Sequence, residues 1–245
     1  MHHNWDIIDI GEIDSTNTYA HWLINNNFDL DEIVIFSLNQ YKGRGQENNK
    51  WESEPYMNIA FSIILKPDYI DISRIFFLNM SVSLGIISFL NSIGIKGMIK
   101  WPNDILVDSK KISGILIENY ILGNSFEFSI VGVGFNVNQI DFGQLDYKAV
   151  SLKNITNNNY NLEETLNYLL NHIWIEIERL KYDKFNEIKQ DYITNLFQYG
   201  EIREYSHKNK TFKGKIIDVL SSGEIIIENE NNEKNRYMNK EIIFL

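Results

Sequence analysis

Four apolar, strand-like segments follow one another between residues 98 and 136 with little chain between them. They are Met98–Trp101, Ile105–Val107, Ile112–Tyr120 and Phe126–Asn136. Parallel strands need a crossover of about a dozen residues or more, whereas antiparallel strands join through short turns. Segments spaced this closely therefore favour an α+β fold built on a mixed, mainly antiparallel sheet.

Hydrophobic periodicity predicts the elements on either side of this block. We expect strands at Trp5–Ile13, Ile33–Leu38 and Asn58–Leu65, and helices at about Thr18–Asn25, Ser73–Ser92 and Leu162–Leu180, with one more ending near Phe197. Residues 14–17 offer side chains that cap the first helix. The helix at Ser73–Ser92 approaches the length of a membrane span, but Asn79, Ser81 and Ser83 interrupt it, so we expect a buried core helix.

The chain changes character after Gly200. Short β-like segments follow at Thr211–Leu220, Glu224–Glu228 and Tyr237–Leu245, with a turn at residues 221–223. The acidic residues 228–235 are typical of a solvated hairpin tip. We therefore expect a larger domain at residues 1–199 and a small barrel-like domain at residues 200–245.

Charge and cysteine content exclude several function classes. The chain has 23 Lys and Arg against 33 Asp and Glu, a formal charge of −10, which argues against broad binding to nucleic acid or to an anionic membrane. It has no cysteine, so disulfides, thiolate zinc sites and thiol nucleophiles are excluded. Its start lacks a basic stretch followed by an apolar run, so a cytoplasmic protein is expected.

The segment Lys100-Trp101-Pro102-Asn103-Asp104 gathers a cation, an aromatic ring, a proline, an amide and a carboxylate between two strands. A strand end with a proline turn and a core tryptophan explains it about as well as a functional site does. The neighbouring lysines favour the site. Lys96, Lys100, Lys110 and Lys111 are opposed only by Asp104 and Asp108, and such a patch suits a phosphate-bearing ligand.

Glycines mark two further candidate segments. Gly114 lies inside an apolar strand, which indicates close approach by a ligand or another backbone, with a bulge or packing need as the even alternative. Gly43-Arg44-Gly45 lies in the polar, aperiodic residues 39–50, a predicted mobile loop, where Arg44 offers a planar fork for phosphate or carboxylate. A flexible surface turn explains that tripeptide better when it is taken alone.

Two other patterns predict no site. Gly132-Val133-Gly134 lacks the third glycine and the following helix of a dinucleotide-binding turn, so it reads as part of a strand. The five histidines lack the spacing with acidic partners of a metal triad or a serine-hydrolase triad, and no protein-held metal is expected. They are His2, His3, His21, His172 and His207.

Taken together, the order and spacing of these segments resemble the biotin–protein ligase family, also called biotin–[acetyl-CoA-carboxylase] ligases. The resemblance rests on Ser15-Thr16-Asn17, Gln40 with Gly43-Arg44-Gly45 and Trp51, the segment at 100–104, Lys111-Ile112-Ser113-Gly114-Ile115-Leu116, and residues 132–138. It implies a class II synthetase-like catalytic fold, with a mixed, mainly antiparallel sheet flanked by helices, followed by a small C-terminal SH3-like β-barrel.

The resemblance also implies a two-step reaction. Biotin and ATP, with Mg²⁺ carried mainly by the phosphates, form biotinoyl-5′-AMP and pyrophosphate, and biotin then passes to a lysine of a biotin carboxyl carrier protein domain of a carboxylase. Implied catalytic residues are Lys111 and Arg44 at the phosphates and Asp104 at the acceptor amine. The implied biotin-binding residues are Ser15, Thr16, Gln40, Gly43 and Gly114, and the implied ATP or adenylate contacts are Arg44, Trp51, Lys100, Asn103, Lys111 and Asn136.

Two departures from the family pattern stand out. Gln46 replaces an arginine found in some members, and residues 47–50 lack a glycine that often follows, which affects how the loop closes. Only residues 1–14 precede Ser15, so we expect a monofunctional ligase without an operator-binding domain. Exposed strand edges permit a homodimer. The alternatives are a lipoate–protein ligase or octanoyltransferase relative, and a non-catalytic sensor of biotin or nucleotide.

Overall fold

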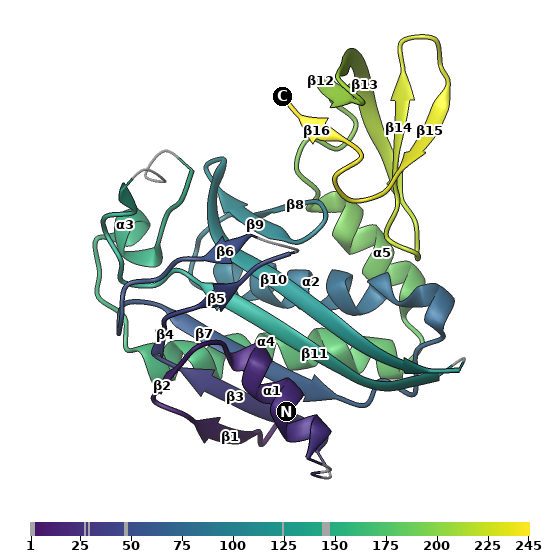
Figure 1. Cartoon of the computed structure of the whole chain (residues 1–245). Helices are drawn as coiled ribbons and strands as arrows, with labels where there is room; N and C mark the ends of the chain where they lie inside the picture. The colour runs from purple at the N-terminus through teal and green to yellow at the C-terminus, as the bar shows by residue number, and fades with distance from the viewer. Residues whose placement is uncertain (1–2, 27, 29, 47–48, 124, 144–147) are drawn as a thin grey trace.

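A seven-stranded sheet forms the centre of the molecule (Figure 1). The computed structural model describes residues 3–26, 28, 30–46, 49–123, 125–143 and 148–245; His2, Glu47 and Asn48, named above, lie outside them. The strand order is β1 (Asp6–Asp9), β3 (Ile33–Ser37), β7 (Ile59–Leu65), β11 (Ser125–Phe135), β10 (Lys110–Leu122), β9 (Asp104–Val107) and β8 (Met98–Lys100). β1 and β3 pair parallel and all other neighbours antiparallel, which confirms the predicted sheet.

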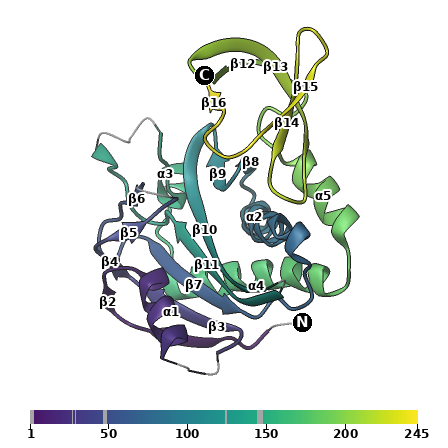
Figure 2. The same ribbon diagram turned by 45° about the vertical axis from the view of Figure 1, so that its right-hand side comes forward.

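Helices cover both faces of this sheet (Figure 2). α1 (Thr16–Asn25) lies on one face, over β3, β7 and β11. α2 (Phe76–Ser92) and α4 (Leu162–Lys181) lie on the other face, with α5 (Phe185–Thr194) packed against α2. The short 3₁₀ helix η1 (Ile72–Arg74) precedes α2, and α3 (Leu152–Thr156) is a short helix that periodicity did not predict.

The interior strand β7 is buried on both faces, as expected from its sequence, which is apolar at every position except Ser62. Phe61 and Ile63 face the core under α2 and α4, whereas Ile64 faces the smaller core under α1 together with Ile35. Side chains alternate between the faces of a strand, so a strand with helices on both sides must be apolar at nearly every position. The sheet is therefore held by two separate apolar layers.

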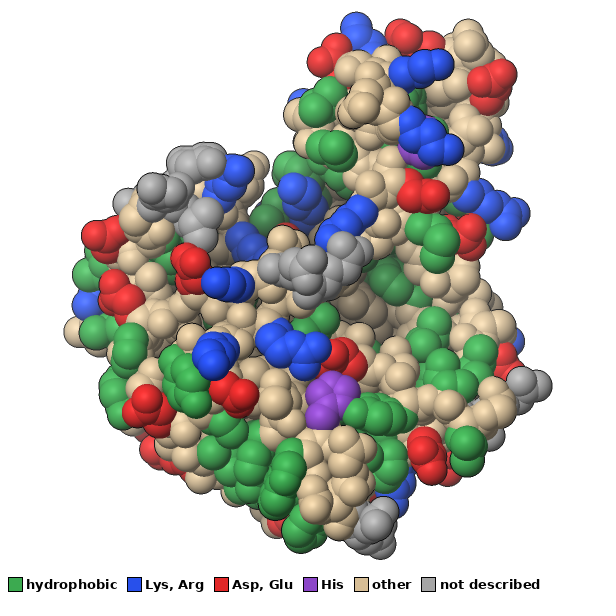
Figure 3. All heavy atoms as spheres, in the orientation of Figure 1, with side chains coloured by type: hydrophobic (Ala, Val, Ile, Leu, Met, Phe, Trp, Pro, Cys, Tyr) green, Lys and Arg blue, Asp and Glu red, His purple; other side chains and the backbone are tan. Residues whose placement is uncertain are grey.

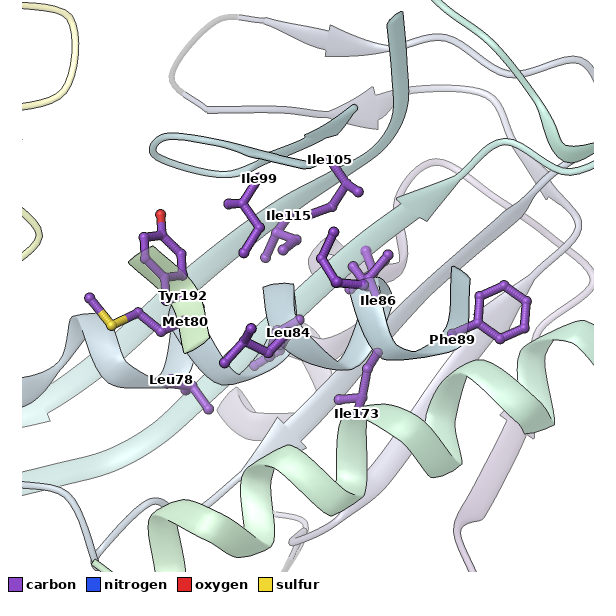
Figure 4. Close-up of a cluster of buried hydrophobic side chains, with 14 of the residues drawn as sticks. Leu78, Met80, Leu84, Ile86, Phe89, Ile99, Ile105, Ile115, Ile173 and Tyr192 are labelled. Carbon is purple, nitrogen blue, oxygen red and sulfur yellow. The ribbon is translucent and has the colours of Figure 1, made fainter. Parts of the chain in front are cut away.

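α2 is the core helix of the protein. Figure 4 shows it between the sheet and α4, with Leu84 and Ile86 among the buried side chains around it. Residues Ile72–Ser92 are the one helical stretch of the described chain that is long and apolar enough to cross a membrane, and 72% of its apolar window is buried inside the protein. The apolar sequence of α2 thus serves packing within the fold.

A second sheet of five antiparallel strands follows α5. Its order is β15 (Lys234–Tyr237), β14 (Ile225–Asn229), β13 (Lys210–Val219), β12 (Ile202–His207) and β16 (Ile243–Phe244). Within residues 202–245, all of which the structure describes, β15 and β16 form the two edges and do not pair with each other. The predicted C-terminal β-structure is confirmed as a small antiparallel sheet; β12 had not been predicted.

Two local differences from the predicted elements shape the functional site. α1 begins at Thr16 rather than near Thr18, and its N-cap residue Ser15 makes no side-chain cap hydrogen bond. The predicted loop at residues 39–50 contains short strand pairs: β4 (Asn39–Gln40) with β2 (Glu12–Ile13), and β5 (Gly43–Arg44) with β6 (Lys50–Trp51). The first turn of α1 and this segment therefore hold defined positions against the sheet.

Candidate active site

A cavity of about 690 Å³, its open mouth included, brings together most of the predicted site residues. Its walls come from the start of α1, the β4–β6 segment, the β9–β10 hairpin and β11. Lys and Arg side chains gather around a hollow near the middle of the same face of the molecule (Figure 3). The predicted residues in its lining are Ser15, Thr16, Gln40, Arg44, Trp51, Asn103, Asp104, Lys111 and Gly114.

One end of the cavity is neutral and polar. The backbone N–H of Thr16 donates to Gln40 Oε1 at 2.9 Å, and the Thr16 hydroxyl donates to the same oxygen at 3.3 Å. The hydroxyl of Ser62, on β7, lies 2.7 Å from Thr16 Oγ1. Because α1 begins at Thr16, its first turn points at the sheet and fixes these groups. This end can bind a neutral ligand through a few directed hydrogen bonds.

The other end of the cavity is charged. Lys111 Nζ lies 2.6 Å from Asp104 Oδ1 across the β9–β10 hairpin, and 5.6 Å from the centre of the Trp51 ring. Asn103 fixes the turn before β9 through two hydrogen bonds to the backbone of Ile115. Its side-chain amide donates to the Ile115 carbonyl at 2.7 Å, and its backbone carbonyl accepts from the Ile115 N–H at 2.9 Å. The hairpin thus presents a lysine and a carboxylate to one space.

Arg44 reaches the mouth of the cavity from β5 and pairs with a carboxylate that had not been predicted as a site residue. Its Nη2 donates to Glu118 Oε1 at 2.6 Å. Burial alone raises the pKa of Glu118, but hydrogen bonds from Asn17 and His21 and the charge of Arg44 outweigh it, so the pKa lies below its ordinary value. Glu118 is therefore an anion at neutral pH.

Three strand glycines form the floor of the cavity. A side chain at Gly132 would overlap the amide of Asn17, and one at Gly134 would overlap the indole of Trp51. A Cβ at Gly114 would come within 2.9 Å of Lys111 Cε and 3.3 Å of the Trp51 ring. The close approach predicted at Gly114 is thus made by the side chains of Lys111 and Trp51, and the Gly132-Val133-Gly134 run makes room for side chains laid flat on the sheet.

Three predicted contact residues lie outside this cavity. Lys100 Nζ lies 5.6 Å from the Phe244 ring in the second sheet. The buried amide of Asn136 donates to the carbonyls of Lys111 and Val150, at 3.3 and 3.1 Å, so it supports the Lys111 backbone. Gly43 lines an adjoining groove and lies behind the Gln40 amide.

Only part of the predicted lysine patch lies at the cavity. Of its four lysines, Lys111 alone lines the cavity, and Lys96 is exposed and outside the lining. Lys50, which had not been singled out, lines the cavity with Arg44. The positive charge at the site therefore comes from two separate parts of the sequence, the β9–β10 hairpin and the β5–β6 pair.

Sequence reasoning missed four polar residues beside the cavity. Asn17 is the third member of the Ser-Thr-Asn triplet, and Glu118 lies two residues beyond the Lys111–Leu116 segment, so a signal for them existed. Ser62 sits inside an apolar strand, and His21 sits on a helix face; nothing in the sequence connects either to the site. All four belong to one hydrogen-bonded group.

The fold is that of a class of α+β ligases. The family model for the Biotin/lipoate A/B protein ligase family matches residues 11–136, more than half of the chain. The chain belongs to this family.

Similar proteins agree with this assignment. The bifunctional ligase/repressor BirA of Bacillus spizizenii is 29% identical over 229 residues, covering 92% of this chain and 70% of that protein. The biotin–[acetyl-CoA-carboxylase] ligase of Mycobacterium tuberculosis is 26% identical over 153 residues, covering 60% of this chain and 55% of that protein. The structure of the biotin protein ligase of Aquifex aeolicus in complex with biotin and ATP superposes with a TM-score of 0.80 at 26% identity, covering 98% of both chains.

Proposed function

We propose that this protein is a biotin–protein ligase, which joins biotin to AMP with release of pyrophosphate and then transfers biotin to a lysine of a carrier protein domain. The observation that carries the proposal is that Lys111 and Arg44 line the same cavity as Thr16 and Gln40. Cations for phosphate and directed groups for a neutral ligand thus share one space. The names of the similar proteins support biotin and ATP as the ligands.

The first step brings the carboxylate of biotin to the α-phosphorus of ATP, so two anions must approach each other. Lys111 and Arg44 lower this repulsion and stabilise the charge that develops on the phosphate oxygens. In a site that excludes water, one such interaction contributes about 3 kcal/mol to the transition state. Among the described residues no group of three or more carboxylate or imidazole side chains gathers to hold a metal. Mg²⁺ is therefore proposed to arrive on the phosphates, as part of the substrate.

Biotin is proposed to occupy the neutral end of the cavity. Its ureido ring offers both donors and acceptors, and Ser15, Thr16 and Gln40 supply matching groups in a largely buried setting. Gly114 lines the same cavity, whereas Gly43 acts from behind Gln40. Ala60 and Leu116 add apolar wall. The carboxylate of biotin then extends toward Lys111.

The adenylate is proposed to lie between Trp51 and the β9–β10 hairpin, beside Asn103 and Lys111. Lys100 and Asn136 take supporting places in this arrangement, since neither lines the cavity. For the second step the acceptor lysine, with an ordinary pKa of about 10.4, must lose a proton before its nitrogen attacks the acyl group. Asp104 is the carboxylate proposed to orient that amine, once Lys111 turns from it to the phosphates.

The acceptor is proposed to be the biotin carboxyl carrier protein domain of a carboxylase, in line with the name of the Mycobacterium tuberculosis relative. We also propose that residues 1–199 and 200–245 are separate domains, since the two sheets lie on either side of this boundary. A cytoplasmic location, homodimer formation through sheet edges and an absence of DNA binding complete the proposal.

The test is a pair of measurements on the intact protein. Incubation with ATP, Mg²⁺ and either biotin or lipoate is followed by assay of pyrophosphate, and a carrier domain is then analysed by intact mass spectrometry. We expect pyrophosphate with biotin and one biotinyl adduct, lost when the acceptor lysine of the carrier is changed to arginine. Pyrophosphate release with lipoate alone would show instead a lipoate ligase. Release with neither acid would indicate a non-catalytic binding protein.

A further inference from the structure

The two carboxylate oxygens of Glu118 bind different partners, one at the mouth of the cavity and the other on the first turns of α1. Oε1 accepts from Arg44 Nη2 at 2.6 Å, and Oε2 accepts from Asn17 Nδ2 at 2.8 Å. His21 Nε2 lies 3.1 Å from Oε2, and its other ring nitrogen hydrogen bonds the hydroxyl of Tyr120. Glu118 itself does not line the cavity.

This carboxylate is anchored more firmly than the arginine it binds. The side chain of Glu118 is 23% exposed and that of Arg44 is 43% exposed. Asn17, which is buried, is in turn held by the Ser62 hydroxyl at 2.6 Å from its Oδ1 and lies flat on the sheet over Gly132. The rigid partner of the pair is therefore Glu118, and the mobile one is Arg44.

We propose that Glu118 is a positioning residue, which holds the Arg44 guanidinium at the mouth of the cavity in the orientation that receives the phosphates of ATP. This rests on the function proposed above. Arg44 has five N–H donors and directs one of them, on Nη2, at Glu118. The remaining donors are available to a phosphate on the other side of the fork. An arginine held in this way loses less rotamer freedom when the nucleotide binds.

The same contacts connect the two ends of the cavity. From Glu118 the hydrogen bonds pass through Asn17 and Ser62 to Thr16, which donates to Gln40. Every member of this chain between Glu118 and Gln40 is buried. The group that orients Arg44 is thus built on the residues that line the neutral end.

The test measures the Kd of ATP by calorimetry without biotin, and the KM of ATP in biotin-dependent pyrophosphate exchange, for Glu118→Gln. This change keeps the size of the side chain and removes its charge. We expect both constants to rise about tenfold, with the Kd of biotin and the melting temperature nearly unchanged. Glu127→Gln, at an exposed position on the neighbouring strand β11, is the matched control and is expected to behave as the wild type.

A double variant separates positioning from a merely structural role. If Glu118 acts through Arg44, then Glu118→Gln adds no further loss of ATP affinity in an Arg44→Ala background. Additive losses, an unchanged Kd, or tighter ATP binding by Glu118→Gln would each overturn the inference. If the wild type forms no adenylate with biotin but Glu118→Gln still weakens ATP binding, the proposed function fails and the positioning role stands.

Discussion

Lys111 Nζ and Asp104 Oδ1 form a 2.6 Å ion pair across the β9–β10 hairpin, inside the cavity. The two side chains are 35% and 28% exposed, so both remain accessible to a ligand. An ion pair this exposed contributes little to stability, on the order of 1 kcal/mol or less. Its value therefore lies in holding a cation and a carboxylate side by side where the proposed reaction needs them.

Lys111→Ala is expected to lower the rate of adenylate formation about 100-fold, because it removes a cation that stabilises charge on the reacting phosphate. Biotin-dependent pyrophosphate exchange measures this rate. Lys96→Ala removes an equal charge at an exposed position outside the cavity and is the matched control, with activity expected within about twofold of the wild type. Equal losses in the two variants would point to a general effect of net charge.

Gly134→Ala tests whether the floor of the cavity needs its glycines. The added methyl group would lie 2.6 Å from Trp51 Cδ2, so the indole must leave the sheet and its place beside Lys111. We expect adenylate formation to fall about tenfold, with a modest loss of stability of about 1–3 kcal/mol from overpacking. Pyrophosphate exchange and thermal unfolding measure the two effects.

The control for this change is Trp51→Ala. With the ring absent, Gly134→Ala has nothing to displace, so the double variant should match Trp51→Ala alone in activity. A further tenfold loss in the double variant would mean that Gly134 serves a ligand directly and not the ring.

Much of the fold follows from local pattern in the chain. The block from residue 98 to 136 is predictable because its short connections leave antiparallel pairing as the simple solution, and β8 to β11 form in that order of pairing. The two-residue strands β4, β5 and β6 are different, because each exists only through a partner elsewhere in the chain. β12 begins with Ile202 and Arg203, both exposed, and so lacks the apolar signal of a buried strand.

The candidate site likewise contains residues that the sequence predicted and residues whose role depends on tertiary packing. Lys111, Asp104 and Arg44 were predicted through the resemblance to the ligase family, because each of their segments taken alone also had a structural explanation. The role of Ser62 depends on the packing of α1 over β7, which brings residues 46 positions apart to within 2.7 Å. Lys100 was predicted to contact the ligand, yet it does not line the cavity, and its Nζ lies 5.6 Å from the Phe244 ring. That contact depends on where the second sheet packs, which the local sequence around Lys100 does not show.

Trp101→Phe tests how the 100–104 segment contributes to the stability of the fold. The indole is buried, and its N–H donates to the Gly223 carbonyl of the second sheet at 2.9 Å. Phenylalanine keeps most of the apolar volume but leaves that carbonyl without its donor, which costs about 1 kcal/mol. The melting temperature should fall by roughly 2–4 °C for a protein of this size.

Scanning calorimetry measures this shift. Trp22→Phe serves as the control, because Trp22 is 51% exposed on α1 and its replacement should change the melting temperature little. If Trp101→Phe has the same melting temperature as the wild type, the hydrogen bond to Gly223 does not stabilise the packing of the second sheet on the seven-stranded sheet and its helices.

The contact between α2 and α4 is expected to make stability depend on pH through His172. Its Nδ1 lies 2.9 Å from the Ser88 hydroxyl, and burial lowers the pKa of His172 below its ordinary value of 6.5. The unfolded chain therefore takes up a proton at a higher pH than the folded protein. As the pH falls below about 6.5, this uptake favours unfolding, and above that value its effect is absent.

Urea unfolding of the wild type and of His172→Asn at several values between pH 5 and pH 8 tests this dependence. Both proteins lose stability on acidification through other groups, so the difference between their free energies of unfolding isolates His172. That difference should stay constant from pH 7 to pH 8 and then shift against the wild type as the pH falls from 6.5 to 5. The opposite shift would mean that the folded state holds His172 protonated, because stability then rises on acidification whenever the folded protein binds the proton more tightly.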